Sequence, residues 1–182
     1  NNLALHMDGV RLSNAAASLD VPVRAFTVDA GVDLVSFGLT KNGAMAAESV
    51  IVLNGDRVQG VDFLRKTYMQ LASKMRFLSA QFVAMLTDDL WLRSAGHANA
   101  MASRLRDGVA DLSGVTITQS VDANAVFVLL PEQVASRLQE RFHFYTWDQA
   151  TGEVRWMCAW DTTESDVDDF IAAVRGEIAS SA

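Results

Sequence analysis

Three short apolar segments in the first third of the chain constrain its fold more than any other feature. In chain order they are Leu3–Met7, Val32–Phe37 and Glu48–Leu53. Each is followed at once by Asp, Gly or Asn, and apolar runs of about four to eight residues bounded in this way are typical of buried strands. Because helix-compatible residues from Ser13 to Leu19 separate the first two segments, their order predicts an α/β fold built in layers.

A regular apolar pattern between residues 58 and 85 predicts one long amphipathic helix. Apolar side chains recur there at spacings of three and four, from Val58 and Val61 to Phe82 and Met85. This spacing gathers them on one side of an α-helix. One interpretation is a helix that joins two lobes of the protein and turns this stripe towards the core. The other is a helix that turns the stripe towards a partner in an oligomer. The two interpretations are compatible.

The pattern changes after Thr87-Asp88-Asp89, where we place the boundary to a small α+β lobe. Helices are expected at 90–111, at 131–141 and from Thr163 towards Arg175, and strands at 115–118, 124–130, 144–146 and 154–160. Pro131 suits the first helical position, where a missing N–H costs nothing. Thr163 and Asp166 resemble a capping box that starts the last helix.

Net charge and cysteine content exclude several classes of function. The 182 residues include 15 Lys and Arg against 22 Asp and Glu, a net charge of −7, which gives no attraction for a phosphate backbone or an anionic membrane. The single cysteine, Cys158, allows no intrachain disulfide, and the sequence suggests no metal site. No apolar run reaches the roughly 18 residues of a membrane span. We therefore expect a cytoplasmic protein, and the start on a strand without Met suggests that an upstream segment is missing.

Lys41 is the strongest candidate for covalent chemistry. It follows the end of a buried strand and lies in a turn next to Gly43, and ligands of α/β sheets collect at the carboxyl ends of strands. A lysine that loses its hydration in such a place becomes a neutral amine, able to form a Schiff base. The alternative is an ordinary solvated lysine in a loop.

Asp8 and Arg11 support the reactive interpretation of Lys41. Asp8 ends another strand, and Arg11 comes close to it if the chain turns helical there. A carboxylate beside a pyridine nitrogen keeps that nitrogen protonated, which makes pyridoxal phosphate (PLP) an effective electron sink. The alternative is an aspartate that caps a helix and forms a surface ion pair.

Three motifs together resemble a known enzyme family. They are His6-Met7-Asp8-Gly9-Val10-Arg11, Ser36-Phe37-Gly38-Leu39-Thr40-Lys41-Asn42-Gly43 and Val154-Arg155-Trp156. In order and spacing they resemble the low-specificity L-threonine aldolases, and above all the bacterial branch that includes phenylserine aldolases. These are fold-type-I PLP enzymes, and only Val10, where the family usually has Ala, departs from the first motif.

The resemblance implies a domain organisation. Residues 1–88 would be the C-terminal part of a PLP-binding large domain with its long connecting helix, and residues 89–182 a small α+β C-terminal domain. Family subunits are about twice as long, so the chain resembles their C-terminal half. The other half would carry the cup for the cofactor phosphate and the histidine that stacks on the ring.

The resemblance also implies roles for five residues. Lys41 would hold PLP, Asp8 would pair with the pyridine nitrogen, and Arg11 would hydrogen-bond the phenolate oxygen. Arg155 would bind the substrate carboxylate, a task for which a planar guanidinium is well suited. Arg76 would reach the cofactor phosphate from a neighbouring subunit of a homo-oligomer, a dimer or tetramer; otherwise it is a surface arginine.

These roles predict an aldolase that cleaves L-threonine or related β-hydroxy-α-amino acids to glycine and an aldehyde. Two alternatives are a non-catalytic fragment that needs the other half of the enzyme, and another fold-type-I lyase that catalyses β-elimination. Structural roles are expected for the remaining candidates. These are His6 in the core, His97 and His143 as structural or surface residues, Trp147, Trp156 and Trp160 in the small-domain core, Cys158 as a buried apolar residue, and Asp166, Asp168 and Asp169 on the solvated face of the last helix.

Overall fold

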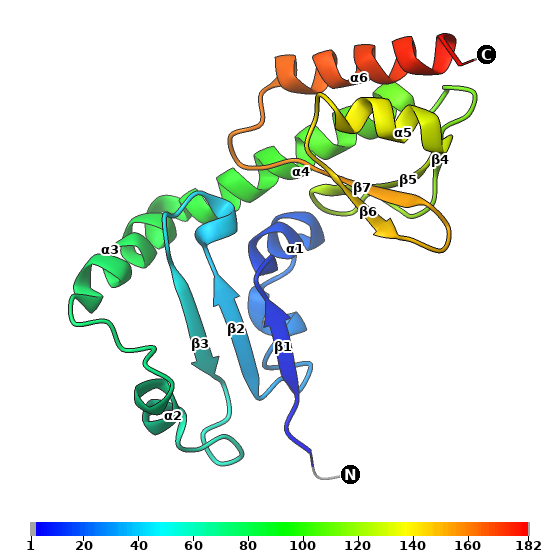
Figure 1. Cartoon of the computed structure of the whole chain (residues 1–182). Coiled ribbons are helices and arrows are strands. Elements are labelled where there is room, and N and C mark those ends of the chain that lie inside the picture. The colour runs from blue at the N-terminus through cyan, green and yellow to red at the C-terminus, as the bar shows by residue number, and fades with distance from the viewer. Residues whose placement is uncertain (1–2, 182) are drawn as a thin grey trace. The chain divides into compact units, whose positions relative to one another are not determined.

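A β-sheet forms the centre of each of two units in the computed structural model, which describes residues 3–181 (Figure 1). The first unit ends at Ser94 and the second begins at Ala95. The strand orders are β1-β2-β3 in the first sheet and β4-β5-β7-β6 in the second. The mixture of helices and sheets is the predicted α/β class.

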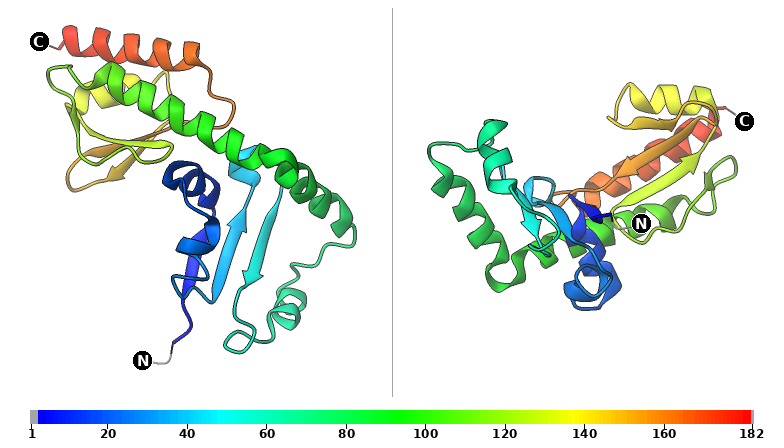
Figure 2. Two further views of the ribbon diagram at one scale, coloured as in Figure 1. Left: turned by 180° about the vertical axis from the view of Figure 1, so that it is seen from behind. Right: turned by 90° about the horizontal axis from the view of Figure 1, so that it is seen from below.

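Parallel pairing of the first two strands organises the first unit. β1 (His6–Gly9) runs parallel to β2 (Leu34–Gly38), and β3 (Glu48–Val52) pairs antiparallel with the other side of β2. β2 lies between β1 and β3 in Figure 1 and in the left panel of Figure 2. The helix α1 (Leu12–Leu19) and the 3-10 helix η1 (Val23–Phe26) connect β1 to β2.

The two faces of this sheet differ in cover. Val35 and Phe37 point to one face and are buried, and Phe37 packs against the rings of Phe82 and Trp91 at centroid distances of 6.0 and 6.1 Å. The opposite face carries exposed residues of β1 and β3, among them Val50, which is 54% exposed, and half-buried residues of β2. Within the first unit, the buried core therefore lies on one side of the first sheet.

The long helix predicted for residues 58–85 is wrong. The structure has two helices there, α2 (Val61–Thr67) and α3 (Met75–Leu86), and Met69 between them has a left-handed backbone with φ of 56°. Within α2 no residue is buried, and within α3 only Met85 is. Apolar spacing records which side a residue faces and not whether the helix is continuous, so it missed the break.

Asp33 ties the start of β2 to its surroundings. Its carboxylate accepts hydrogen bonds from the backbone N–H of Leu5 (2.9 Å), from Asn54 Nδ2 (2.9 Å) and from Arg57 Nη1 (3.3 Å). The side chain is buried. The hydrogen bond from Leu5 lowers the pKa of its carboxyl group, and the hydrogen bond from Asn54 and the positive charge of Arg57 lower it further, whereas burial acts in the opposite direction.

The lowered pKa of Asp33 predicts acid sensitivity. A depressed pKa contributes stability that is full above the unfolded value of about 3.9 and is lost as the pH falls towards the folded value. We expect Asp33→Asn to lower the melting temperature at pH 7, and the difference from wild type to shrink below about pH 4. Thermal unfolding between pH 3 and 7 tests this, with exposed Asp56→Asn as control; an unchanged difference at low pH would refute it.

Most elements of the second unit lie where the sequence predicts them. After the 3-10 turn η3 (Thr87–Asp89), the helices are α4 (Leu90–Val109), α5 (Glu132–Gln139) and α6 (Glu164–Ala179). The strands are β4 (Thr116–Ile117), β5 (Ala125–Leu129), β6 (Tyr145–Asp148) and β7 (Glu153–Met157). The capping box of Thr163 and Asp166 is confirmed, whereas Pro131 stands at the N-cap of α5 and not at its first helical position.

All three helices contribute to the core on one face of the second sheet. The buried cluster combines residues of α4, α5 and α6 with those of β5 and β7, and at its centre Trp156 packs edge-on against Phe170 with 5.0 Å between centroids. Because strand residues alternate between faces, Phe127 and Arg155 point to the opposite face. The helices of this buried cluster pack against the face that carries Trp156.

No helix within residues 3–181 combines the length and apolar character that crossing a membrane requires. Across the same residues, His, Cys, Asp and Glu side chains form no group of three that could hold a metal ion.

Candidate active site

Parallel pairing brings two of the predicted site residues to the same edge of the first sheet. Asp8 lies at the carboxyl end of β1, and its register partner on β2 is Ser36. Lys41 follows three residues after the end of β2, in the 3-10 turn η2 (Thr40–Asn42). Since the carboxyl ends of parallel strands share one edge, the acid and the amine belong to one end of the sheet.

The turn that carries Lys41 is anchored on both sides. Buried Asn42 donates from Nδ2 to the carbonyl of Trp91 (2.7 Å), and Thr40 Oγ1 accepts from the backbone N–H of Ala47 (3.0 Å). Gly43 closes the turn with φ of 113°, a conformation that favours glycine. Lys41 therefore sits on a fixed backbone while its own side chain is exposed.

The exposure of Lys41 corrects one expectation. The sequence suggested an amine stripped of water, whereas the described chain leaves this side chain open to solvent. The anchored turn fixes the position of the Lys41 amine. Loss of its hydration would require a further group that covers this edge of the sheet.

Asp8 faces the uncovered side of the sheet. Its carboxylate is exposed and accepts a hydrogen bond from the backbone N–H of Val10 (3.2 Å), so acceptor positions remain for another donor. Arg11 is the N-cap residue of α1 and is partly buried, three residues beyond Asp8 as the sequence predicted.

Gly9 allows β1 and β2 to approach closely beside Asp8. A Cβ at this position would lie 2.8 Å from Val35 Cγ1 and 2.9 Å from the carbonyl oxygen of Ser36. The second of these atoms belongs to the backbone and cannot rotate away.

We expect Gly9→Ala to destabilise the protein by about 1–3 kcal/mol, because the added methyl group overpacks the sheet. Urea unfolding measures the change. Gly55→Ala is the matched control, since a Cβ there meets no atom within 4 Å, and equal effects of the two substitutions would contradict the steric argument.

His6 is not the core residue that the sequence suggested. It is exposed, and its Nε2 forms a hydrogen bond with Ser36 Oγ at 2.8 Å. The pair lies on the face of Asp8, because His6 and Asp8 are two residues apart on one strand. Ser36 was missed by the sequence reasoning, and only the register of β1 on β2 reveals it.

Arg76, the predicted phosphate ligand, lies in the first turn of α3. It is exposed, and its guanidinium carbon is 4.7 Å from the ring centroid of Phe77.

Arg155 belongs to the second unit, so the predicted site residues are divided between the two units. It lies on β7, and its guanidinium carbon is 4.3 Å from the ring centroid of Trp147. Trp147 is 53% exposed and Trp160 46%, so of the three tryptophans assigned to the core only Trp156 is buried. Trp147 was misassigned because aromatic content alone does not reveal which face of a strand a residue occupies.

Cys158 is buried, as predicted, and burial raises the pKa of its thiol to about 11. The thiol is therefore protonated at neutral pH and is not a nucleophile. His97 is exposed and its Nε2 is 2.7 Å from the carbonyl oxygen of Thr162, while exposed His143 packs against the ring of Tyr145.

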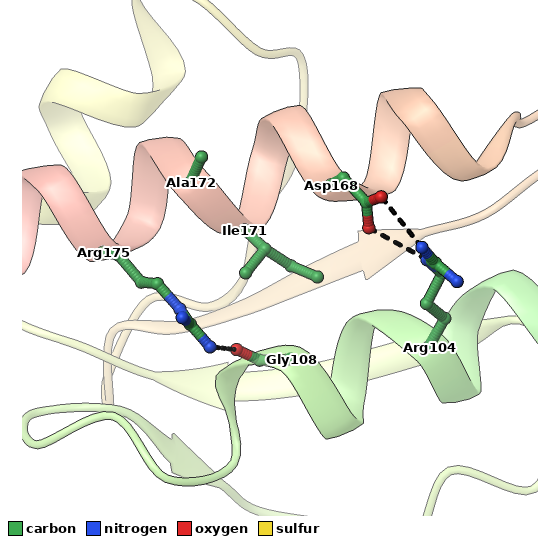
Figure 3. Close-up of a pocket in the computed structure, with 6 residues that line it drawn as sticks. All are labelled: Arg104, Gly108, Asp168, Ile171, Ala172 and Arg175. Atoms are coloured by element: carbon green, nitrogen blue, oxygen red, sulfur yellow. Dashed lines mark hydrogen bonds and ion pairs between the residues drawn. The ribbon is translucent and has the colours of Figure 1, made fainter.

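A shallow groove between α4 and α6 contains charged residues that are already engaged (Figure 3). Arg104 donates two hydrogen bonds to Asp168, at 2.9 and 2.8 Å, and Arg175 donates to the carbonyl of Gly108 (3.0 Å). Asp168 is thus a partner in helix packing, and Asp166 is the cap described above.

Comparison with known proteins agrees with the motifs. A model of the beta-eliminating lyase family matches residues 1–133. A low specificity L-threonine aldolase of Pseudomonas sp. is 43% identical over 174 residues, which are 95% of this chain and 50% of that protein. One of Pseudomonas aeruginosa is 46% identical over 161 residues, 88% of this chain and 46% of that protein.

The fold agrees as well. The structure of a threonine aldolase of Leishmania major superimposes with a TM-score of 0.85 at 26% identity, over 97% of this chain and 52% of that one. The resemblance predicted from the three motifs is therefore confirmed, and with it the fold. The chain spans about half the length of the curated relatives it matches.

Proposed function

Because this chain belongs to the beta-eliminating lyase family, we propose that the complete protein is a PLP-dependent aldolase of which this chain is the C-terminal half. It would cleave L-threonine and related β-hydroxy-α-amino acids, phenylserine among them, to glycine and an aldehyde. The observation that carries the proposal is the shared sheet edge of Asp8 and Lys41, in a chain that is 43–46% identical to two threonine aldolases.

The residues at this edge fit PLP in their chemistry. An exposed amine on an anchored turn suits covalent attachment of an aldehyde, and the open acceptor positions of the Asp8 carboxylate suit a protonated ring nitrogen. Lys41 would hold the cofactor covalently, Asp8 would bind its ring nitrogen, and Arg11 its phenolate oxygen. Bound PLP would supply the sink for the electron pair left at Cα when the Cα–Cβ bond breaks.

Asp8 and Arg155 would have separate roles, one towards the cofactor ring and one towards the substrate carboxylate. Asp8 would keep a proton on the ring nitrogen, because a carboxylate next to that proton stabilises it. Arg155 would bind the substrate carboxylate through two parallel N–H donors, which fixes the rotation of the substrate about Cα. The β-hydroxyl proton has to pass to a base, and none of the residues named here is assigned to that step.

Partners are part of the proposal. Large apolar side chains of the first unit are exposed, and they suit burial against another half of the same protein or a second subunit. Among them are Val50, Phe63, Leu64, Tyr68, Met69, Phe77 and Val83. We infer a homo-oligomer in which exposed Arg76 binds the cofactor phosphate of a neighbouring subunit. A cytoplasmic location remains a prediction.

Two alternatives make different predictions. A β-eliminating lyase would convert a hydroxy amino acid to a 2-oxo acid, such as pyruvate, and ammonia. A non-catalytic fragment would show no turnover, and its intact mass under denaturing conditions would be near 19.8 kDa.

The decisive experiment is incubation of the complete, PLP-loaded protein with L-threonine and with phenylserine. Glycine and the matching aldehyde in equal amounts are expected. Formation of ammonia in place of glycine would identify an eliminating lyase, and failure to convert either substrate would refute the aldolase proposal.

A further inference from the structure

The outer face of the second sheet carries a stack of three side chains. The guanidinium carbon of Arg155 lies 4.3 Å from the ring centroid of Trp147. Phe127 packs edge-to-face on the same indole, with 5.5 Å between centroids and 72° between planes. Arg155 is also the register partner of Phe127 on the neighbouring strand, so the indole of Trp147, which comes from β6, contacts both.

A β-bulge in β6 lies at Trp147. Thr146 pairs with Val154 and Asp148 with Glu153, so that Trp147 has no residue opposite it. Bulges bend a strand and re-aim a side chain, and they are frequent beside functional sites. Tyr145 is the register partner of Arg155 on β6, so Trp147, two residues further along, is a diagonal neighbour of Arg155 on the same face.

Arg155 has no acidic partner within residues 3–181. Glu153, on the same face two residues earlier, instead accepts a hydrogen bond from the hydroxyl of Thr118. The Nε of Arg155 is buried without a hydrogen-bond partner among the described residues. In contrast, ion pairs are formed by Arg24, Arg57, Arg104, Arg106 and Arg137.

Stacking fixes a guanidinium without using its donors. An aromatic ring over the flat face of a guanidinium leaves the in-plane N–H groups available to a carboxylate, which binds through two parallel hydrogen bonds. Holding the side chain in this plane beforehand reduces the conformational entropy that it loses when a ligand binds.

We propose that Trp147, supported by Phe127, is a positioning residue that presets the guanidinium of Arg155 for the carboxylate of an α-amino acid. The inference deepens the proposed function and rests on it for the role of Arg155. Trp147 acts only through Arg155, so its effect on ligand affinity has to disappear when Arg155 is absent.

A double-mutant cycle in the complete, PLP-loaded protein tests this, with glycine as the ligand and calorimetry as the measurement. Trp147→Leu should weaken glycine binding by about 5- to 30-fold, the size of a partly desolvated cation–π contact. In an Arg155→Leu background the same change should have an effect of less than about twofold. Trp147→Phe should restore affinity to within about threefold, because it keeps an aromatic face.

The matched control is Trp160→Leu, which removes a tryptophan of similar exposure in the same unit and should leave glycine affinity unchanged. A purely structural role of Trp147 would lower affinity equally in both backgrounds, and that additivity would overturn the inference. Unaltered affinity in Trp147→Leu would also overturn it, while threonine cleavage by the wild type would still support the aldolase. If glycine binds with the expected coupling but threonine is not cleaved, the proposed function fails and the inference stands; absence of glycine binding overturns both.

Discussion

Replacing Lys41 with alanine in the complete protein should abolish cleavage of L-threonine, with a loss of at least about 10⁴-fold in kcat. The anchored turn of Thr40 and Asn42 holds this amine at the sheet edge that Asp8 shares. Removal of the amine removes the covalent attachment point, and the only other lysines of the sequence are Lys66 and Lys74. Steady-state assays of glycine formation measure the effect.

Lys66→Ala is the matched control for this prediction. Lys66 is also exposed and lies in the last turn of α2, so its loss should leave kcat within about twofold of wild type. The absorbance of bound cofactor gives a second readout, because Lys41→Ala should lose covalently attached PLP whereas Lys66→Ala retains it. Near-normal turnover of Lys41→Ala would refute the assignment of this residue.

Replacing Trp156 with alanine should destabilise the protein by about 3–5 kcal/mol. Trp156 is 2% exposed, and its ring packs edge-on against Phe170 and Phe144, at centroid distances of 5.0 and 6.2 Å. The substitution removes the largest side chain of this cluster and leaves a cavity that the surrounding sheet and helices fill only in part. Urea unfolding followed by circular dichroism measures the loss.

Two variants separate packing from other causes. Trp160→Ala removes a tryptophan that is 46% exposed and should cost less than about 1 kcal/mol. Trp156→Phe keeps an aromatic ring and removes a buried Nε1 that has no hydrogen-bond partner among the described residues; it should cost clearly less than Trp156→Ala. Equal destabilisation by Trp156→Ala and Trp160→Ala would contradict the packing argument.

Trp156 also connects the core to the proposed site. Trp156 follows Arg155 directly within β7, so the two side chains point to opposite faces of the sheet. Loss of the inner anchor should therefore also weaken glycine binding through displacement of Arg155, an effect that Trp160→Ala should not produce.

Local chemistry explains what could be predicted from the sequence alone. The Asp8-Gly9 and Lys41-Asn42-Gly43 ends of two strands, the capping box of Thr163, and the helix of residues 90–111 all depend on neighbours within a few positions. The order of such motifs also sufficed for the family, because each motif is short and its spacing is visible in one dimension.

Tertiary structure decided the features that depend on residues far apart in the chain. The register of β1 on β2 placed Ser36 beside His6. The sequence predicted His6 in the core, whereas its side chain is accessible to solvent. The break around Met69 was invisible because apolar spacing continues across it. A one-residue bulge in β6 lies at Trp147, which contacts Arg155 across the strands. Strand pairing and bulges are chosen by the packing free energy of whole sheets, so no short window of sequence encodes them.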